Sequence, residues 1–251
     1  MKVLNNKTVI VTGAAGGIGR AIAQEAGRAG ANIALIDINS EELKKTADTI
    51  RNDGSEVLEC TVDITDKTLW QKSIDDIATH FDGIDVMVNN AIWVKYEPMN
   101  EVEEDVYRRQ MAIGLDAVFW GIQAVTPHMI AKGTGSIMNM TSPASVHGIV
   151  NGSVYAAIKG AISSLTRQCA VELGQKGIRV NAVAPGPMPT PGTMRIVDEE
   201  GWGKRLARSP LGRLATPEGV ARTVIFLASD QADCINGDVI FADGGRSISA
   251  M

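Results

Sequence analysis

The stretch Thr8–Gly19, TVIVTGAAGGIG, decides the fold. Its first five residues are all β-branched, and such a run predicts a buried strand that ends at Gly13. The residues from Ile18 to Ala29 follow with the pattern of a helix. A strand, a glycine-rich turn and a helix in this order bring free backbone N–H groups and a helix N-terminus to one place, which is how proteins bind phosphate groups.

The three glycines of this turn have separate expected roles. Gly13 permits the tight turn, Gly17 lets the backbone approach a pyrophosphate, and Gly19 lets the helix pack closely on the strand. Ile18 begins the helix and offers its backbone N–H to the same phosphates. A plain structural turn is the alternative, but the position between the first strand and the first helix favours nucleotide binding.

Strand and helix patterns alternate along the rest of the chain. Strands are predicted at 8–12, 32–36, 57–62, 84–88, 136–140, 179–183 and 239–241, and helices at 18–29, 40–52, 66–81, 101–131 (as two helices), 153–175 and 217–229. Because the strands are continuously apolar, both faces of the sheet are buried by helices. The pattern predicts one α/β domain over residues 1–251, a Rossmann-type doubly wound parallel sheet of about seven strands with helices on both faces. The irregular stretch 185–212, rich in proline and glycine, is expected to be a substrate-binding loop or lid.

Composition excludes several function classes. The 251 residues are 45 % hydrophobic and 21 % charged, with a net charge of −5 and no basic run, so we expect no nucleic-acid partner. No apolar stretch reaches the roughly 18 residues of a membrane span. Three distant cysteines, Cys60, Cys169 and Cys234, indicate neither a disulfide framework nor a metal site. A cytoplasmic protein that acts on a small molecule is the expectation.

Asp37 ends the second predicted strand, 18 residues after Gly19. A carboxylate at this place accepts hydrogen bonds from both ribose hydroxyls of an adenosine and repels a 2′-phosphate, which favours NAD over NADP. The nearest basic residue, Arg20, is expected to point along the helix, away from a 2′-phosphate. A turn or helix-capping role for Asp37 remains the alternative.

Tyr155 and Lys159 lie four residues apart in a predicted helix and so share one face. A phenol is a poor base at neutral pH, but a lysine ammonium one turn away stabilises the phenolate and lowers its pKa. The hydroxyl-bearing residues Thr141 and Ser142 end the preceding strand, at the edge where ligands bind in open α/β sheets. These residues predict general acid–base chemistry on an alcohol or carbonyl oxygen.

The whole chain resembles the short-chain dehydrogenase/reductase family, in its branch of about 250 residues. The motifs that carry the resemblance are TGAAGGIG at 12–19, Asp63, NNA at 89–91, Ser142, the Tyr155/Lys159 pair, Asn181, Pro185-Gly186, Thr190 and Asp243-Gly244-Gly245. The resemblance implies catalysis by Ser142, Tyr155 and Lys159, with Ser142 on the substrate oxygen, Tyr155 as general acid/base and Lys159 on the nicotinamide ribose. It also implies a set of NAD-binding residues: Gly13, Gly17, Ile18, Gly19, Asp37, Asp63, Ile64, Asn90, Ala91, Tyr155, Lys159, Pro185, Gly186, Met188 and Thr190.

Two positions depart from the family's pattern. Gly114 stands where the family usually has a catalytic Asn, and Ile92 stands where a Gly usually follows Asn-Asn-Ala. In the family this Asn supports a water mainly through its backbone carbonyl, which Gly114 retains. We therefore expect activity to survive and restoration of Asn at 114 to change the rate only modestly. Ile92 is expected to narrow the cleft.

Trp93, Ser142 and Met188 are expected to bind the substrate, which an otherwise apolar lining predicts to be a small, neutral, largely apolar alcohol or ketone, cyclic ones included. The function expected is an NAD-dependent alcohol dehydrogenase or ketone reductase. A 3-oxoacyl-carrier-protein-type reductase is one alternative, and a non-catalytic NAD-binding sensor or scaffold is another. In the family the helices near 115–130 and 153–173 also pair between subunits, which implies a homotetramer or homodimer.

Overall fold

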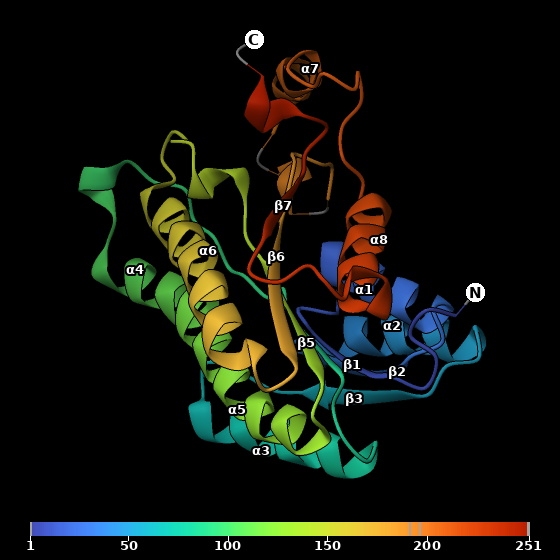
Figure 1. Ribbon diagram of the computed structural model, residues 1–251. Coiled ribbons are helices and arrows are strands. Elements are labelled where there is room, and N and C mark those ends of the chain that lie inside the picture. The colour runs from blue at the N-terminus through green and yellow to red at the C-terminus, as the bar shows by residue number, and fades with distance from the viewer. Residues whose placement is uncertain (1, 191, 196, 250–251) are drawn as a thin grey trace.

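The computed structural model describes residues 2–190, 192–195 and 197–249 (Figure 1). Seven parallel strands form one sheet in the order β3-β2-β1-β4-β5-β6-β7. The strands are β1 (Thr8–Thr12), β2 (Asn32–Asp37), β3 (Val57–Thr61), β4 (Val86–Asn89), β5 (Gly135–Met140), β6 (Ile178–Pro185) and β7 (Val239–Ala242). Their order reverses between β1 and β4, and open α/β sheets bind ligands at the carboxyl edge of such a switch point. The predicted Rossmann-type parallel sheet is confirmed.

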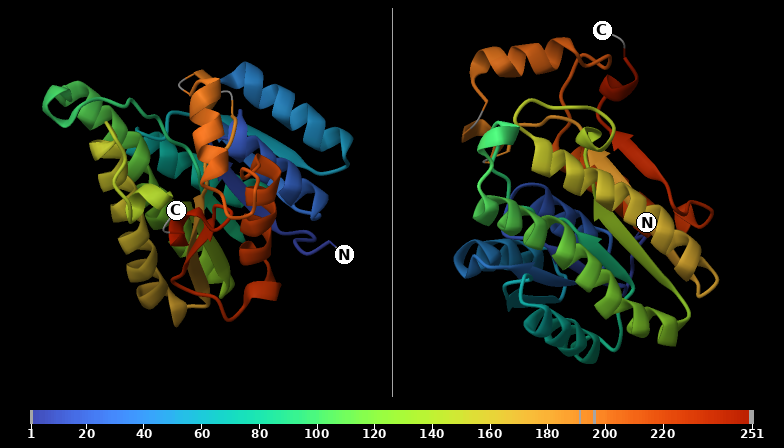
Figure 2. Two further views of the ribbon diagram at one scale, coloured as in Figure 1. Left: turned by 90° about the horizontal axis from the view of Figure 1, so that it is seen from above. Right: turned by 90° about the vertical axis from the view of Figure 1, so that its left-hand side faces the viewer.

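Helices cover both faces of the sheet (Figure 2). The first face carries α1 (Gly17–Arg28), α2 (Ser40–Asn52) and α8 (Pro217–Ala228), and the second carries α3 (Lys67–His80), α5 (Ala117–Lys132) and α6 (Ser153–Gly174). Right-handed crossovers between parallel strands produce this division. None of the helices in the described part of the chain is long and apolar enough to cross a membrane.

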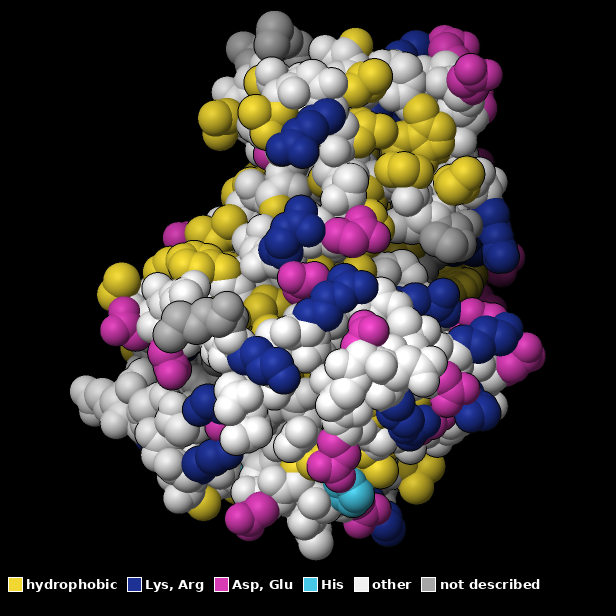
Figure 3. Space-filling view, turned by 90° about the vertical axis from the view of Figure 1, so that its right-hand side faces the viewer, with side chains coloured by type: hydrophobic (Ala, Val, Ile, Leu, Met, Phe, Trp, Pro, Cys, Tyr) yellow, Lys and Arg dark blue, Asp and Glu magenta, His cyan; other side chains and the backbone are white. Residues whose placement is uncertain are grey.

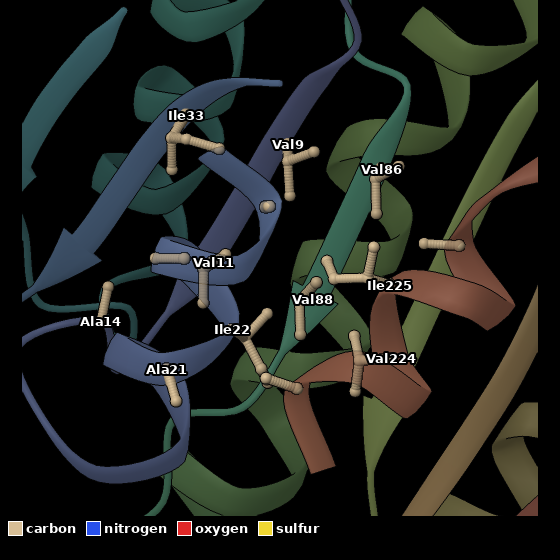
Figure 4. Close-up of a cluster of buried hydrophobic side chains, with 14 of the residues drawn as sticks. Val9, Val11, Ala14, Ala21, Ile22, Ile33, Val86, Val88, Val224 and Ile225 are labelled. Carbon is tan, nitrogen blue, oxygen red and sulfur yellow. The ribbon is translucent and has the colours of Figure 1, made fainter. Parts of the chain in front are cut away.

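The core has two layers because side chains alternate along each strand. Val9 and Val11 of β1 face α1 and α8, where Ile22 and Val224 meet them (Figure 4). Ile10, between them in the sequence, faces the opposite layer, which α3, α5 and α6 cover. Every residue of β1 is therefore buried, which explains why its sequence shows no polar alternation.

The segment predicted as two helices over 101–131 differs from the expectation. Its helix begins at Glu104, and α4 (Glu104–Met111) continues into α5 through a π-helical turn at Ala112–Asp116, without a break. Gly114 lies at the middle of that turn. Such π-helical turns inside α-helices frequently mark functional sites.

The segment predicted as irregular over 185–212 contains a helix, α7 (Glu199–Ala207). The carboxylate of Asp198 caps it by accepting a hydrogen bond of 2.8 Å from the Gly201 N–H. Gly201 and Gly203 disfavour helix, so the sequence pattern missed it. Residues 191 and 196 of this stretch lie outside the described residues.

Candidate active site

The carboxyl ends of β1 and β4 are joined through the Thr12 side chain. Its hydroxyl oxygen accepts hydrogen bonds from the backbone N–H groups of Asn90, at 2.9 Å, and Ala91, at 3.0 Å. The Asn90 amide in turn donates to the Thr12 carbonyl at 2.9 Å. Asn90 therefore holds the glycine-rich turn through its side chain, a role that the sequence did not indicate.

The same contacts explain two of the glycines. A Cβ at Gly13 would lie 2.9 Å from the Asn90 amide nitrogen, and a Cβ at Gly19 would lie 2.6 Å from it and overlap the Gly13 carbonyl. Gly13 and Gly17 also have φ of +67° and +53°, which L side chains rarely adopt. A Cβ at Gly17 would meet nothing within 4 Å, so the space above this residue is open. The turn thus provides room for a phosphate group beside the start of α1, which no side chain caps.

Asp37 lies against this turn. One carboxylate oxygen accepts the Ala15 N–H at 3.0 Å, and the other accepts the Asn39 N–H at 3.0 Å. The position of Arg20 differs from the expectation. Its guanidinium folds back over the turn, where it hydrogen-bonds the Ala15 carbonyl and pairs with Glu42 at 2.7 Å. The ion pair with the Glu42 carboxylate holds the Arg20 guanidinium in this position and offsets its positive charge.

Ser142, Tyr155 and Lys159 come together at the carboxyl end of β5. Ser142 is the second residue after the strand, while Tyr155 and Lys159 occupy successive turns at the start of α6. The Lys159 ammonium lies 5.7 Å from the centre of the Tyr155 ring. Burial raises the pKa of Tyr155, and a hydrogen bond with the Ser142 hydroxyl acts in the opposite direction. The lowering of this pKa by Lys159 stays a prediction.

The Lys159 ammonium is buried, and it donates to the Met140 carbonyl at 2.7 Å. Burial lowers the pKa of Lys159 to about 8. An ammonium has three N–H donors, and Met140 accepts only one of them. The other donors are suited to ribose hydroxyls, so the residues present fit a nicotinamide cofactor.

The other residues that the resemblance assigns to the cofactor lie in the turns after β3 and β6. Asp63 accepts hydrogen bonds from Thr65, at 2.9 Å from its N–H and 2.8 Å from its hydroxyl, and Ile64 is buried. Gly186 follows Pro185 and leaves no room for a Cβ, which would lie 2.6 Å from the Asp243 Cα.

Thr193 organises the turn that contains Met188 and Thr190. Its hydroxyl donates to the Met188 carbonyl at 2.8 Å and accepts the Thr190 N–H at the same distance. Sequence reasoning did not identify Thr193, because a lone hydroxyl in a proline-rich stretch carries no signal.

Aromatic and basic residues surround the mouth of the site. The Arg109 guanidinium lies 4.2 Å above the Trp93 ring and covers one of its faces. Tyr96 stands edge-to-face with Tyr155, with the ring centres 6.0 Å apart. Burial and the neighbouring Tyr155 raise the pKa of Tyr96 to about 12, while Arg205 of α7 lowers it. Tyr96, which the sequence places at the mouth, lies near Arg205, which the sequence did not single out.

A hollow of about 380 Å³ lies at the opposite, amino edge of the sheet. Lys7, Asp85 and Arg179 are among the residues that line it. Its buried carboxylate, that of Asp85, pairs with Lys132 at 2.8 Å and accepts the Thr8 N–H at 2.9 Å. The Asp85 contacts join the starts of two strands, so we assign this edge a structural role.

The chain is similar to known proteins in sequence and in fold. The sequence profile of a family described as enoyl-(acyl carrier protein) reductase matches residues 13–247. The chain is 33 % identical to 5-keto-D-gluconate 5-reductase of Escherichia coli over 247 residues, 98 % of this chain and 97 % of that protein.

Two solved structures are similar throughout. One is 7α-hydroxysteroid dehydrogenase with NADH and 7-oxo glycochenodeoxycholic acid, at a TM-score of 0.94 and 32 % identity, covering 97 % of this chain and 95 % of that one. The other, from Beutenbergia cavernae, is described as an NAD(P)-dependent gluconate 5-dehydrogenase with NADP at low occupancy, at a TM-score of 0.93 and 36 % identity, covering 99 % of both chains. The chain belongs to the short-chain dehydrogenase/reductase family of oxidoreductases.

Proposed function

We propose that this protein is an NAD(H)-dependent oxidoreductase that interconverts a secondary alcohol and a ketone. The observation that carries the proposal is the gathering of Ser142, Tyr155 and Lys159 beside the glycine-rich turn, at the carboxyl edge of the sheet. A hydroxyl, a phenol and an ammonium are the groups needed to bind an alcohol oxygen and remove its proton.

Each of the three residues has a defined task. The nicotinamide ring, when bound, accepts or donates the hydride. The Ser142 hydroxyl donates a hydrogen bond to the substrate oxygen, and Tyr155 takes the alcohol proton as the hydride leaves the carbon. The Lys159 ammonium holds the nicotinamide ribose, and its positive charge favours the phenolate of Tyr155. In ketone reduction Tyr155 returns the proton to the oxygen.

NAD is the proposed cofactor because Asp37 is the charged group at the end of β2. Its carboxylate would accept the adenosine ribose hydroxyls and repel a 2′-phosphate. Arg20 lies nearby, but its pairing with Glu42 leaves it poorly placed to offset that repulsion. Gly13, Gly17, Ile18 and Gly19 would hold the pyrophosphate.

The remaining residues would hold the two ends of the cofactor. Asp63 and Ile64 would contact the adenine, and Asn90 and Ala91 would line the cleft. Pro185, Gly186, Met188 and Thr190 would hold the nicotinamide.

The substrate has two candidate classes. Trp93 provides apolar surface for a neutral, largely apolar alcohol, as the sequence predicts. The Met188 side chain, which the sequence also assigned to the substrate, is buried in the hydrophobic core. A hydroxy or keto acid is the second candidate, because Arg205 and Arg208 lie close enough to the half-buried Arg246 to add to the lowering of its pKa that partial burial causes. Within the described residues, none of these arginines forms an ion pair with a carboxylate.

Figure 3 shows hydrophobic and basic side chains intermixed on the surface formed by α7 and the C-terminal segment, at the top of the view. The same arginines would suit an acidic acyl-carrier protein, but Asp37 disfavours the NADPH that we expect for such a reductase. A non-catalytic NAD-binding sensor is disfavoured because the catalytic side chains are all present.

Further features of the proposal concern the assembly. Residues 1–251 would fold as one domain, with 185–212 covering the substrate. The exposed apolar residues Phe119 of α5 and Val171 of α6 support pairing of these helices between copies, as a homodimer or homotetramer. The three free cysteines suit the cytoplasm.

A panel of neutral and acidic secondary alcohols, assayed with NAD and NADP in parallel, tests the proposal. We expect an increase in absorbance from NADH with at least one alcohol, and no turnover by Tyr155→Phe. Turnover only with NADP would refute the role of Asp37. Binding of NADH without turnover of any alcohol or ketone, carrier-bound ketones included, would favour the sensor.

A further inference from the structure

The two positions that depart from the family's pattern touch each other. A Cβ placed on Gly114 would lie only 2.8 Å from the δ-methyl of Ile92. It would also lie 3.0 and 3.1 Å from two methyl carbons of Ile158. Carbon atoms in contact are normally about 3.5–4.0 Å apart, so a side chain at 114 has no room beside Ile92.

The two isoleucines differ in their freedom to move. Ile158 is fully buried, whereas Ile92 is 39 % exposed. A small group added at 114 can therefore displace the end of Ile92 toward solvent, while the buried Ile158 methyl groups need to give by only a few tenths of an ångström. An asparagine adds three more heavy atoms beyond the Cβ, so it needs more of the space that Ile92 now occupies.

This contact lies against the catalytic helix. Ile158 is in α6, three residues after Tyr155 and one before Lys159, and it packs on the π-helical turn at Gly114. The segment that carries Ile92 has a second attachment, because the next residue, Trp93, stacks on Arg109 of α4. The loop after β4, the π-helical turn and α6 therefore meet at one apolar point.

We propose that Ile92 and Gly114 form one packing unit, in which Ile92 fills the volume of a side chain at 114 and sets the position of Tyr155 and Lys159. The unit acts through Ile158, so its members are positioning residues and do not touch the reacting atoms. This inference rests on the proposed function only where it is tested by turnover of an alcohol or ketone. It also replaces the expectation that Gly114→Asn changes the rate only modestly, because that expectation did not consider the contact between residue 114 and Ile92.

A double-variant cycle tests the coupling. Gly114→Ala should reduce kcat/KM by at most about threefold, because the Ile92 methyl can turn away, whereas Gly114→Asn should reduce it at least about tenfold. Ile92→Ala makes room, so Ile92→Ala combined with Gly114→Asn should recover to within about threefold of Ile92→Ala alone. The loss in Gly114→Asn should fall on kcat, with an unchanged Kd and stoichiometry for NADH measured by fluorescence.

Gly160→Asn is the matched control, since it also adds a side chain to a helical glycine of the described chain. A Cβ there would meet only the Ser145 carbonyl, at 3.9 Å, so we expect its Tm to stay within a few degrees of the parent. The proposal would be overturned if the double variant lost kcat/KM by the product of the two single losses. It would also be overturned if Gly114→Asn were as stable and as active as Gly160→Asn. A loss of NADH-binding sites in step with kcat would show unfolding in place of repositioning, which also overturns it.

The same cycle measured by thermal unfolding separates this proposal from the proposed function. If the parent turns over no alcohol or ketone, the proposed function fails. The Tm values of the parent, the two single variants and the double variant then still test the packing unit. The proposal requires that adding Ile92→Ala restores part of the Tm that Gly114→Asn loses.

Discussion

Replacement of the buried Lys159 by methionine should stabilise the protein while abolishing its activity. The free-energy cost of burying the ammonium follows from its pKa, which burial lowers from 10.5 to about 8. At about 1.4 kcal/mol for each tenfold change, this corresponds to about 3 kcal/mol. The variant loses the hydrogen bond to Met140, worth about 1 kcal/mol, which leaves a net gain of about 2 kcal/mol. For a chain of this size, that raises Tm by about 4–8 °C.

The gain should depend on pH in a defined direction. Below pH 8, Lys159 is charged in both the native and the unfolded state, so the burial cost is fully present. As the pH rises from 8 toward 10.5, the native lysine is neutral while the unfolded lysine still binds a proton, so the cost fades. Urea unfolding of Lys159→Met and the parent between pH 6 and 10 measures this, with the exposed Lys176→Met as a control expected to stay within about 0.5 kcal/mol. A variant less stable than the parent at pH 7, or a difference independent of pH, would refute the reasoning.

Four other substitutions test separate parts of the site. Tyr155→Phe removes the proton acceptor and should lower kcat by about 100-fold or more without changing the Kd for NADH, measured by fluorescence titration. Asp37→Ser removes a charged hydrogen-bond acceptor and should raise the KM for NAD by about 10- to 100-fold while raising kcat/KM for NADP. Steady-state kinetics with both cofactors would contradict this if the ratio of kcat/KM for NAD to that for NADP stayed constant. Gly19→Ala places a methyl group on the Gly13 carbonyl and should abolish NADH binding, whereas retention of tight binding would show that the turn can move. Arg205→Gln should raise the KM of acidic substrates about tenfold and leave that of neutral alcohols unchanged, and equal effects on both would exclude Arg205 as an anion site.

Local patterns were sufficient to predict the sheet because its central strands are buried on both faces and the helices that flank them on one. Val9, Ile10 and Val11 are apolar together for this reason, and the glycine-rich turn follows them directly. The same local reasoning failed for α7, whose capping by Asp198 overcomes two glycines, and for the continuous helix through Gly114. In both cases, contacts or backbone geometry outweighed residue preference.

The site divides in a similar way. Ser142, Tyr155 and Lys159 could be predicted because their spacing and their place after strands carry the chemistry. Thr193 and Arg205 could not, nor could the link from Thr12 to Asn90, because these contacts reach residues far away or in irregular backbone, and one residue type in isolation gives no signal. Arg20 was misplaced for the same reason, since its pairing with Glu42 joins two different helices.

The sequence by itself determined the order of strands and helices, the glycine-rich turn and the chemical groups available for catalysis, because these depend on neighbours in the chain. Only the tertiary structure decided which distant residues share a volume. It showed that Ile92 occupies the space beside Gly114, that Asn90 holds the turn, and that burial lowers the pKa of Lys159. Packing and desolvation depend on every atom within a few ångströms, and those atoms come from segments far apart in the sequence.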